Sequence, residues 1–303
     1  MTRFDRAFLH DATPSPILRI ACVAAILSTW IGCSRGGSPT SPSGPPAAGS
    51  MIVWAAIGAS DVTGIGSSVP CLLQDCANGT GYIAVAARQL RAQGFTLDLL
   101  NLGLPTAVIG RDFETLGQQY NRVIAGNFIE QEMPFVQRTA TLVTIFAGLN
   151  EINTVTAALG AGAGGSDPNG FIDAQVRAFG ADFTTLMRGV ADRAGSPRIV
   201  VLNLPNPAGM PYLAAAPLAQ RQAAQRAAVG MTRTVVNPLA SSSTAIVDLM
   251  CDARSYQAST YSSDGLHPND GGYAFIGSEV VRAITSASYP SPQGACAFMS
   301  IAP

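Results

Sequence analysis

The chain has 303 residues, of which 48% are hydrophobic and 12% are charged, and its formal net charge is −1. Its 18 basic residues are scattered arginines with no lysine among them, which excludes a Walker A loop, a Ser-x-x-Lys hydrolase and a Schiff-base lysine. The scatter also argues against nucleic acid as a partner, and the two histidines, His10 and His267, lie too far apart for a His-Glu-x-x-His metal motif.

Residues 1–33 are typical of a bacterial export signal. Three arginines precede an apolar run at 20–31, which is too short to span a bilayer comfortably. The run ends at Cys33 in Trp-Ile-Gly-Cys, which resembles a lipobox whose cysteine is lipidated. We expect a lipoprotein of the bacterial envelope or, alternatively, a secreted protein. Residues 34–50 are nearly all Gly, Ser, Pro and Ala, which predicts a flexible tether.

From residue 51 onward, apolar runs alternate with segments of helical periodicity. The runs predict buried strands of a parallel sheet at 51–58, 96–103, 141–148, 198–204 and 244–249. Helices are expected at 81–94, 113–133, 171–193, 218–236 and 272–286. Strictly alternating strands and helices predict one α/β domain over 51–303, a three-layer α/β/α sandwich around a parallel sheet of about five strands.

A glycine-rich stretch at 157–170 interrupts this rhythm. Gly160, Gly162 and Gly165 have the spacing of a dinucleotide-binding fingerprint, but a Ser-Asp-Pro-Asn turn follows them instead of a helix. We therefore predict a mobile surface loop that could border the substrate site, and no dinucleotide.

Four cysteines follow the leader region: Cys71, Cys76, Cys251 and Cys296. An even number in an exported protein favours disulfides, and three pairings are possible. The short spacing of Cys71 and Cys76 favours pairing these two, which leaves Cys251 for Cys296.

Polar residues follow several of the predicted strands. Ser60 comes after the first strand, Gly103 ends the second, and Asn150 follows the third, while His267 precedes the last helix. Because ligands bind beyond the carboxyl ends of parallel strands, these segments can converge at one edge of the sheet. His267 is the one histidine outside the leader, and Asp264 lies three residues before it, close enough to orient the imidazole.

These residue types meet the requirements of nucleophilic catalysis. Ser60 can attack, His267 can take its proton, and Asp264 can orient the histidine. The N–H groups of Ser60 and Gly103, with the side-chain amide of Asn150, can supply an oxyanion hole.

Four blocks in order resemble those of the SGNH, or GDSL-type, hydrolases, and the likeness runs from residue 51 to about 286. They are 57–66 (IGASDVTGIG), 101–103 (NLG), 148–151 (GLNE) and 264–268 (DGLHP). The resemblance implies a flavodoxin-like fold and a serine esterase with the triad and oxyanion hole just named, and it requires no metal or organic cofactor. The family's usual Gly-Asp-Ser-Leu reads Gly-Ala-Ser-Asp here, which keeps the nucleophile but weakens any inference about substrate.

The resulting hypothesis is an exported monomer that hydrolyses carboxylic esters, such as acyl lipids, short-chain esters or acetylated glycans, and touches a membrane only through its lipid. A dedicated carbohydrate O-deacetylase and a non-catalytic tethered binding protein of the same fold are the alternatives. Among the neighbouring acids, Glu151 is interpreted as a solvated or turn-bonding carboxylate, and Asp270 as a helix cap.

Overall fold

The computed structural model describes residues 44–72 and 75–303, so the predictions for the export signal, Cys33 and most of the tether lie outside the described residues. Within them the chain builds a sheet of five parallel strands in the order β2-β1-β3-β4-β5. The strands are β1 (Met51–Gly58), β2 (Thr96–Asn101), β3 (Leu142–Phe146), β4 (Arg198–Leu202) and β5 (Thr244–Val247). The predicted strands are all confirmed, although four of them end earlier than expected.

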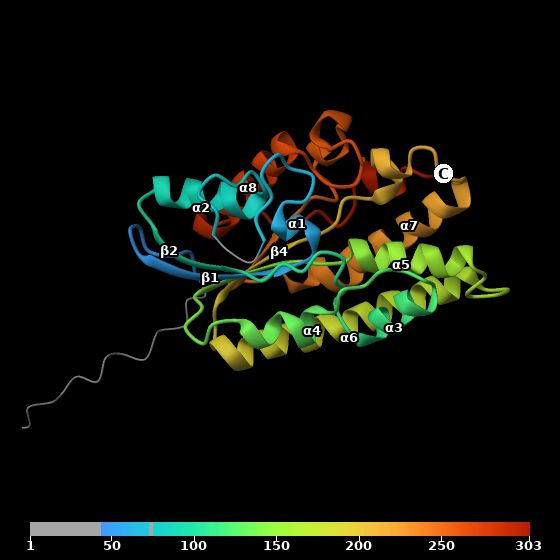
Figure 1. Ribbon diagram of the computed structural model, residues 1–303, viewed down its shortest axis with the longest axis horizontal. Coiled ribbons are helices and arrows are strands. Elements are labelled where there is room, and N and C mark those ends of the chain that lie inside the picture. The colour runs from blue at the N-terminus through green and yellow to red at the C-terminus, as the bar shows by residue number, and fades with distance from the viewer. Residues whose placement is uncertain (1–43, 73–74) are drawn as a thin grey trace, which may run out of the picture. The chain divides into compact units, whose positions relative to one another are not determined.

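Helices cover both faces of the sheet (Figure 1). One face carries α2 (Tyr82–Ala92) and α8 (Asp270–Thr285), which pack against each other. The opposite face carries α3 (Arg111–Gln119), α4 (Phe128–Gln131), α5 (Leu149–Gly160) and α6 (Pro168–Ala194), while α7 (Leu218–Met231) packs against α5 and α6. A short helix, α1 (Ser60–Thr63), follows β1. This is the predicted three-layer α/β/α sandwich.

The sheet is buried from both sides, which is why its strands read as continuous apolar runs. Every residue of β3, β4 and β5 is buried, including Arg198, whose guanidinium donates to the carbonyls of Ala283 and Ser286 at the end of α8. Trp54 of β1 is fully buried and donates its indole N–H to Thr144 Oγ1 at 3.0 Å. The strand order reverses between β1 and β3, the place in such a sheet where ligands bind.

Two segments differ from the sequence prediction. The helix expected at 113–133 breaks into α3 and α4, because Asn121 adopts a left-handed φ of 57° and the chain returns to pair Asn127 with Val108 before Asn127 caps α4. The loop expected at 157–170 shrinks to the turn 161–167, since α5 continues to Gly160 and α6 begins at Pro168. Burial of Ile152, Val155 and Ala158 holds α5 helical despite its glycine.

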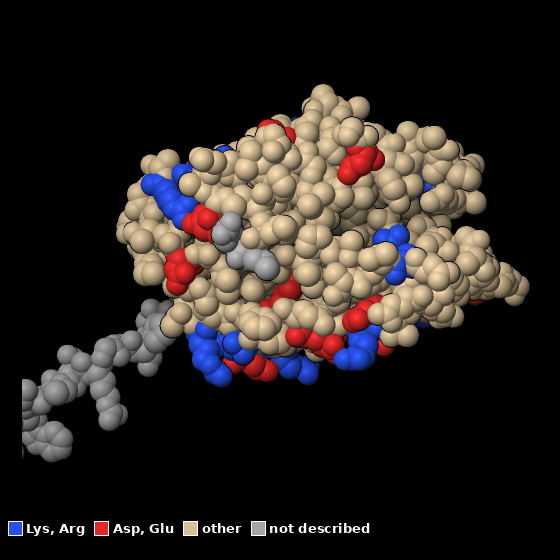
Figure 2. Space-filling view, in the orientation of Figure 1, with Lys and Arg blue, Asp and Glu red and all other residues tan. Residues whose placement is uncertain are grey.

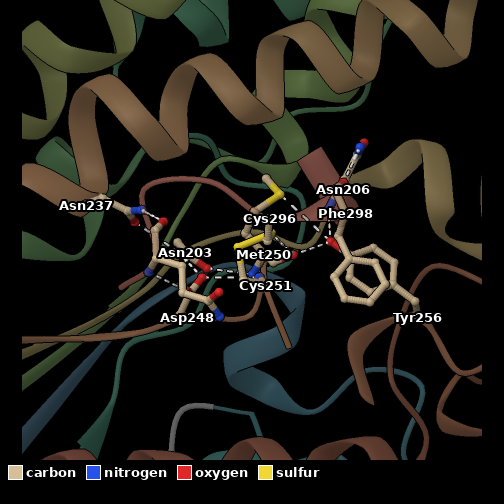
Figure 3. Close-up of a disulfide and its surroundings, with 10 residues drawn as sticks. Asn203, Asn206, Asn237, Asp248, Met250, Cys251, Tyr256, Cys296 and Phe298 are labelled. Carbon is tan, nitrogen blue, oxygen red and sulfur yellow. Dashed lines mark hydrogen bonds between the residues drawn. A yellow bond between two sulfur atoms is a disulfide. The ribbon is translucent and has the colours of Figure 1, made fainter. Parts of the chain in front are cut away.

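Both favoured disulfide pairings are confirmed: Cys71 is bonded to Cys76 and Cys251 to Cys296. Figure 3 shows the second bond, which joins the segment after β5 to the C-terminal segment. Beside it, Asn203 at the end of β4 donates to Asp248 at 2.8 Å, and the rings of Tyr256 and Phe298 stack 4.3 Å apart. The C-terminal segment is thereby fixed to the carboxyl edge of β4 and β5.

Charged side chains on the face in Figure 2 gather along one edge, over α3, α4 and α6, with Arg interspersed among Asp and Glu. One such pair is Arg111 with Glu130, 2.7 Å apart, which joins α3 to α4. No helix within residues 44–72 and 75–303 combines the length and the apolar character needed to cross a membrane.

Candidate active site

Ser60 lies at a sharp turn where β1 enters α1. Gly58 ends the strand with φ 151°, and a Cβ there would lie 2.6 Å from the Phe146 carbonyl oxygen and 2.5 Å from Val62. Only glycine fits this close approach to β3. Ser60 is the first residue of α1, so its N–H has no partner inside the helix. The turn therefore presents both the hydroxyl and the amide of Ser60 beyond the strand end.

Asp264 and His267 share a tight loop before α8. Gly265 turns the chain with φ 68°, and the Ser262 N–H donates to the His267 carbonyl at 2.8 Å. His267 Nε2 lies 2.8 Å from Ser60 Oγ, and His267 Nδ1 lies 2.6 Å from Asp264 Oδ2. The structure thus connects Ser60, His267 and Asp264 by hydrogen bonds in that order, across a separation of more than two hundred residues.

Asp264 is held as a hydrogen-bond acceptor by its own loop. Its Oδ1 accepts from the N–H groups of Leu266 and His267, at 2.8 and 2.9 Å, and from the Ser262 hydroxyl at 2.8 Å. Partial burial alone would raise the pKa of Asp264, but these bonds and the imidazole hold it well below the ordinary value. Asp264 therefore stays ionised beside the imidazole throughout the neutral range.

Asn150 lies at the start of α5 and lines the same small cavity as Ser60 and His267. One hydrogen of its side-chain amide bonds the Ala107 carbonyl at 2.8 Å, which leaves the second available. The cavity has a volume of about 20 Å³, space for little more than one water-sized group.

Gly103 is not brought to this cavity. It is buried behind α1, and its N–H donates to Asn101 Oδ1 at 3.0 Å. The Asn101 amide in turn donates to the Val62 carbonyl at 3.0 Å, so this pair fastens the end of β2 to α1. The contribution of Gly103 to an oxyanion hole stays a prediction, one that requires its present hydrogen bond to break.

Two acids have roles other than those expected. Glu151 is only 1% exposed rather than solvated, and it accepts a hydrogen bond from the Ile109 N–H; burial raises its pKa to about 7. The expected solvated carboxylate is therefore wrong, and the bond to Ile109 joins segments 42 residues apart. Asn269, not Asp270, caps α8, because its side chain accepts from the Gly272 N–H at 3.1 Å. Asp270 instead accepts from the N–H and hydroxyl of Ser68, at 2.7 and 2.6 Å.

Sequence reasoning missed two carboxyl groups close to Ser60. Glu132 is buried, and its Oε2 accepts from the Gly58 N–H at 2.8 Å, just before the turn; burial raises its pKa well above the ordinary value. Asp61 lies next to Ser60, and burial raises its pKa while the nearby His267 lowers it. The position of Asp61 next to Ser60 was a signal in the sequence, whereas Glu132 lies in no recognisable motif.

No group of three or more His, Cys, Asp or Glu side chains in the part of the chain that the structure describes is placed to hold a metal ion. The three-layer fold thus places a serine, a histidine and an aspartate, linked by hydrogen bonds, at the carboxyl edge of a parallel sheet, where α/β proteins bind their ligands.

Solved structures of other proteins share this fold. A lipase from a goat rumen metagenome has a similar structure, with a TM-score of 0.53 and 14% identity over 78% of this chain and 99% of that one. An extracellular lipase from Streptomyces rimosus is similar too, with a TM-score of 0.51 and 17% identity over 78% and 100% of the two chains. At these identities the likeness establishes the fold. No curated protein matches the sequence.

Residues 56–275 match the model of the GDSL-like lipase/acylhydrolase family, and the chain belongs to that family. It is a carboxylic ester hydrolase.

Proposed function

We propose that the protein is an exported serine esterase that cleaves carboxylic esters through an acyl-enzyme on Ser60. The observation that carries the proposal is the continuous hydrogen-bonded connection from Ser60 Oγ to His267 Nε2 (2.8 Å) and from His267 Nδ1 to Asp264 (2.6 Å). A nucleophile next to a base, with a third group that orients the base, is what acyl transfer requires.

In the first half of the reaction, Ser60 Oγ attacks the ester carbonyl carbon while His267 Nε2 accepts the hydroxyl proton. The imidazolium that forms is stabilised by the ionised Asp264, whose own hydrogen bonds keep it deprotonated. His267 then protonates the leaving alcohol as the carbon–oxygen bond breaks, which leaves the acyl group on Ser60.

In the second half, a water molecule takes the place of the alcohol. His267 accepts a proton from this water as the water oxygen attacks the acyl carbon, and the proton passes to Ser60 Oγ when the acid leaves. Each half starts and ends with neutral His267, so one histidine serves both steps without another base.

The negative charge on the carbonyl oxygen needs hydrogen-bond donors in both halves. The Ser60 N–H, free of an intrahelical partner, and the second hydrogen of the Asn150 amide are the donors that we assign to it. Asn150 is held for this purpose, because its other amide hydrogen is fixed on the Ala107 carbonyl.

Export is part of the proposal. Residues 1–33 have the charge and apolar pattern of an export signal ending at Cys33. The disulfides Cys71–Cys76 and Cys251–Cys296 support the proposal, because such bonds persist in oxidising compartments. A lipid on Cys33 would then hold the catalytic domain near a membrane surface, with 34–50 as the tether.

The test is hydrolysis of short p-nitrophenyl esters by the wild type and by Ser60→Ala. The rate should fall by several powers of ten in the variant, on the order of what removing a triad member costs elsewhere. Ser288→Ala, the same change at an exposed position, is the control and should keep the full rate. An undiminished rate in Ser60→Ala, or a wild type with no esterase activity, would contradict the proposal.

A further inference from the structure

A groove much larger than the catalytic cavity lies over α5 and α7. Its volume is about 840 Å³, against about 20 Å³ for the cavity around Ser60 and His267. Small residues of the two helices, such as Ala157, Gly160 and Ala223, form much of its lining. This volume lies in the range of ligand sites, whereas the catalytic cavity holds no more than the reacting group. The helices that border the groove lie side by side in Figure 1.

The groove begins close to the catalytic cavity. Asn150 lines the cavity and Asn153 lines the groove, and residues three apart share one face of a helix, about 4.5 Å apart along its axis. Tyr212 joins the same two places: its hydroxyl donates to Asn153 Oδ1 at 3.0 Å, and its N–H donates to the Gly265 carbonyl at 2.9 Å, in the loop of Asp264 and His267. These contacts place the near end of the groove about one helical turn along α5 from the catalytic cavity.

One charged side chain lines the groove. Among the described residues that line the groove, Arg122 is the only Asp, Glu, Lys or Arg. Its Nε is buried and has no hydrogen-bond partner in the part of the chain that the structure describes. A buried N–H without an acceptor is unfavourable, and more so on a charged group.

Nothing in the lining neutralises Arg122. Burial lowers the pKa of its guanidinium and the nearby Tyr212 and Glu151 raise it, yet arginine stays protonated in proteins. Glu151 is the carboxyl whose charge acts on it, and burial raises the pKa of Glu151 to about 7, so this group is largely protonated below neutral pH. The groove therefore presents a cation that lacks a full counter-charge.

We propose that the groove binds the extended part of an ester substrate that carries an anionic group, with Arg122 as the partner of that anion. The planar guanidinium suits a carboxylate or a phosphate, which can accept two parallel hydrogen bonds. This inference rests on the proposed function, because it uses the position of Ser60 as the point of cleavage. It makes Arg122 a residue that determines specificity.

The test uses pairs of esters that differ only in charge. In one arm the charge lies in the acyl part: the p-nitrophenyl monoester of adipic acid is compared with the p-nitrophenyl ester of adipic acid monoamide. In the other arm the charge lies in the alcohol part: 3-acetoxybenzoate is compared with 3-acetoxybenzamide. In at least one arm the wild type should prefer the anionic member in kcat/KM by about tenfold, and that arm identifies which side of the ester occupies the groove.

Three variants assign the preference. Arg122→Gln should lower kcat/KM for the anionic ester about tenfold, mainly through KM, and should change the rate for the neutral amide less than about twofold. Arg122→Lys should recover part of the preference, because lysine keeps the charge but cannot form the two parallel hydrogen bonds of a guanidinium. Arg138→Gln removes the same charge at an exposed position outside the groove and should leave both rates unchanged.

A wild type that hydrolyses both members of both pairs equally well would overturn the inference while leaving the esterase proposal intact. Equal losses on charged and neutral esters in Arg122→Gln would overturn it as well. If the wild type hydrolyses none of the four esters, calorimetric titration of Ser60→Ala with adipate monoamide and with adipamide decides: tighter binding of the anion supports the groove, and equal binding contradicts it.

Discussion

The cavity around Ser60 and the groove over α5 and α7 lie next to each other but are built differently. Around the cavity the catalytic side chains are held by hydrogen bonds: Asp264 accepts four, and one hydrogen of the Asn150 amide is fixed on Ala107. The groove is wide, lined by small residues, and has an arginine with an unpartnered Nε. We infer that the cavity performs the reaction and that the groove selects what is brought to it.

If the cavity performs the reaction, the largest loss of kcat is expected when His267 is replaced. His267→Ala removes the group that moves the proton in both halves of the reaction, so kcat on a neutral p-nitrophenyl ester should fall by several powers of ten. Far-ultraviolet circular dichroism should remain that of the wild type. A loss of less than about tenfold would show that another base serves Ser60.

Asp264→Asn should cost less than the loss of His267 but still about 10⁴-fold in kcat. The amide keeps the size of the carboxylate and loses the charge that stabilises the imidazolium, and its NH₂ now faces the Nδ1 position of His267. Steady-state kinetics on the same ester measures the effect. If Asp264→Asn retained the wild-type rate, Asp264 would have no electrostatic role.

Asn150→Ala removes one of the proposed oxyanion donors, so kcat should fall by about 10²–10³-fold with little change in KM. Asn153→Ala, one helical turn further along α5, is the matched control, since Asn153 lines the groove and not the cavity. Both variants are measured on a small neutral ester. If kcat fell strongly in Asn153→Ala and not in Asn150→Ala, the assignment of Asn150 to the oxyanion would be wrong.

The buried Glu151 should make stability depend on pH. Its pKa rises from 4.5 to about 7 in the folded protein, so the folded state keeps a proton that the unfolded chain has already lost in this range. Stability therefore falls as pH increases between these values. The unfolding free energy of Glu151→Gln minus that of the wild type should therefore increase by about 2 kcal/mol from pH 5 to pH 8.

Denaturant unfolding at the two pH values measures this change. Any constant cost of the glutamine amide cancels in the comparison, so only the titration of Glu151 remains. A difference between variant and wild type that does not change with pH would show that Glu151 titrates normally.

The sequence predicted the sheet because strands buried on both faces leave long apolar runs, as β1 and β3 do. It also placed Ser60, Asp264 and His267, since each lies in a short recognisable block at a strand or helix end. The contacts of the buried acids could not be predicted from the sequence. Glu132 bonds Gly58 and Glu151 bonds Ile109, and each bond joins segments far apart in the chain.

The hydrogen bond of Gly103 could not be predicted from the sequence either, although its partner is only two residues away. The motif suggested a free N–H at the end of β2, whereas the side chain of Asn101, two residues earlier, takes that N–H for itself. Asn side chains compete for nearby backbone donors in this way, and which donor they choose depends on the tertiary contacts around them. The groove was anticipated only in part: the stretch 157–170 lines it, but Arg122, Asn153 and Tyr212 come from three separate segments with no common motif.

Covalent labelling distinguishes Ser60 from every other serine as the nucleophile. The wild type is treated with a fluorophosphonate, which forms a stable bond with an activated serine oxygen, and the modified residue is located by peptide mass mapping. We expect one adduct, on Ser60, that is lost in His267→Ala because the hydroxyl is no longer activated. An adduct on a different serine, or labelling of Ser60 that is equally fast without His267, would contradict it.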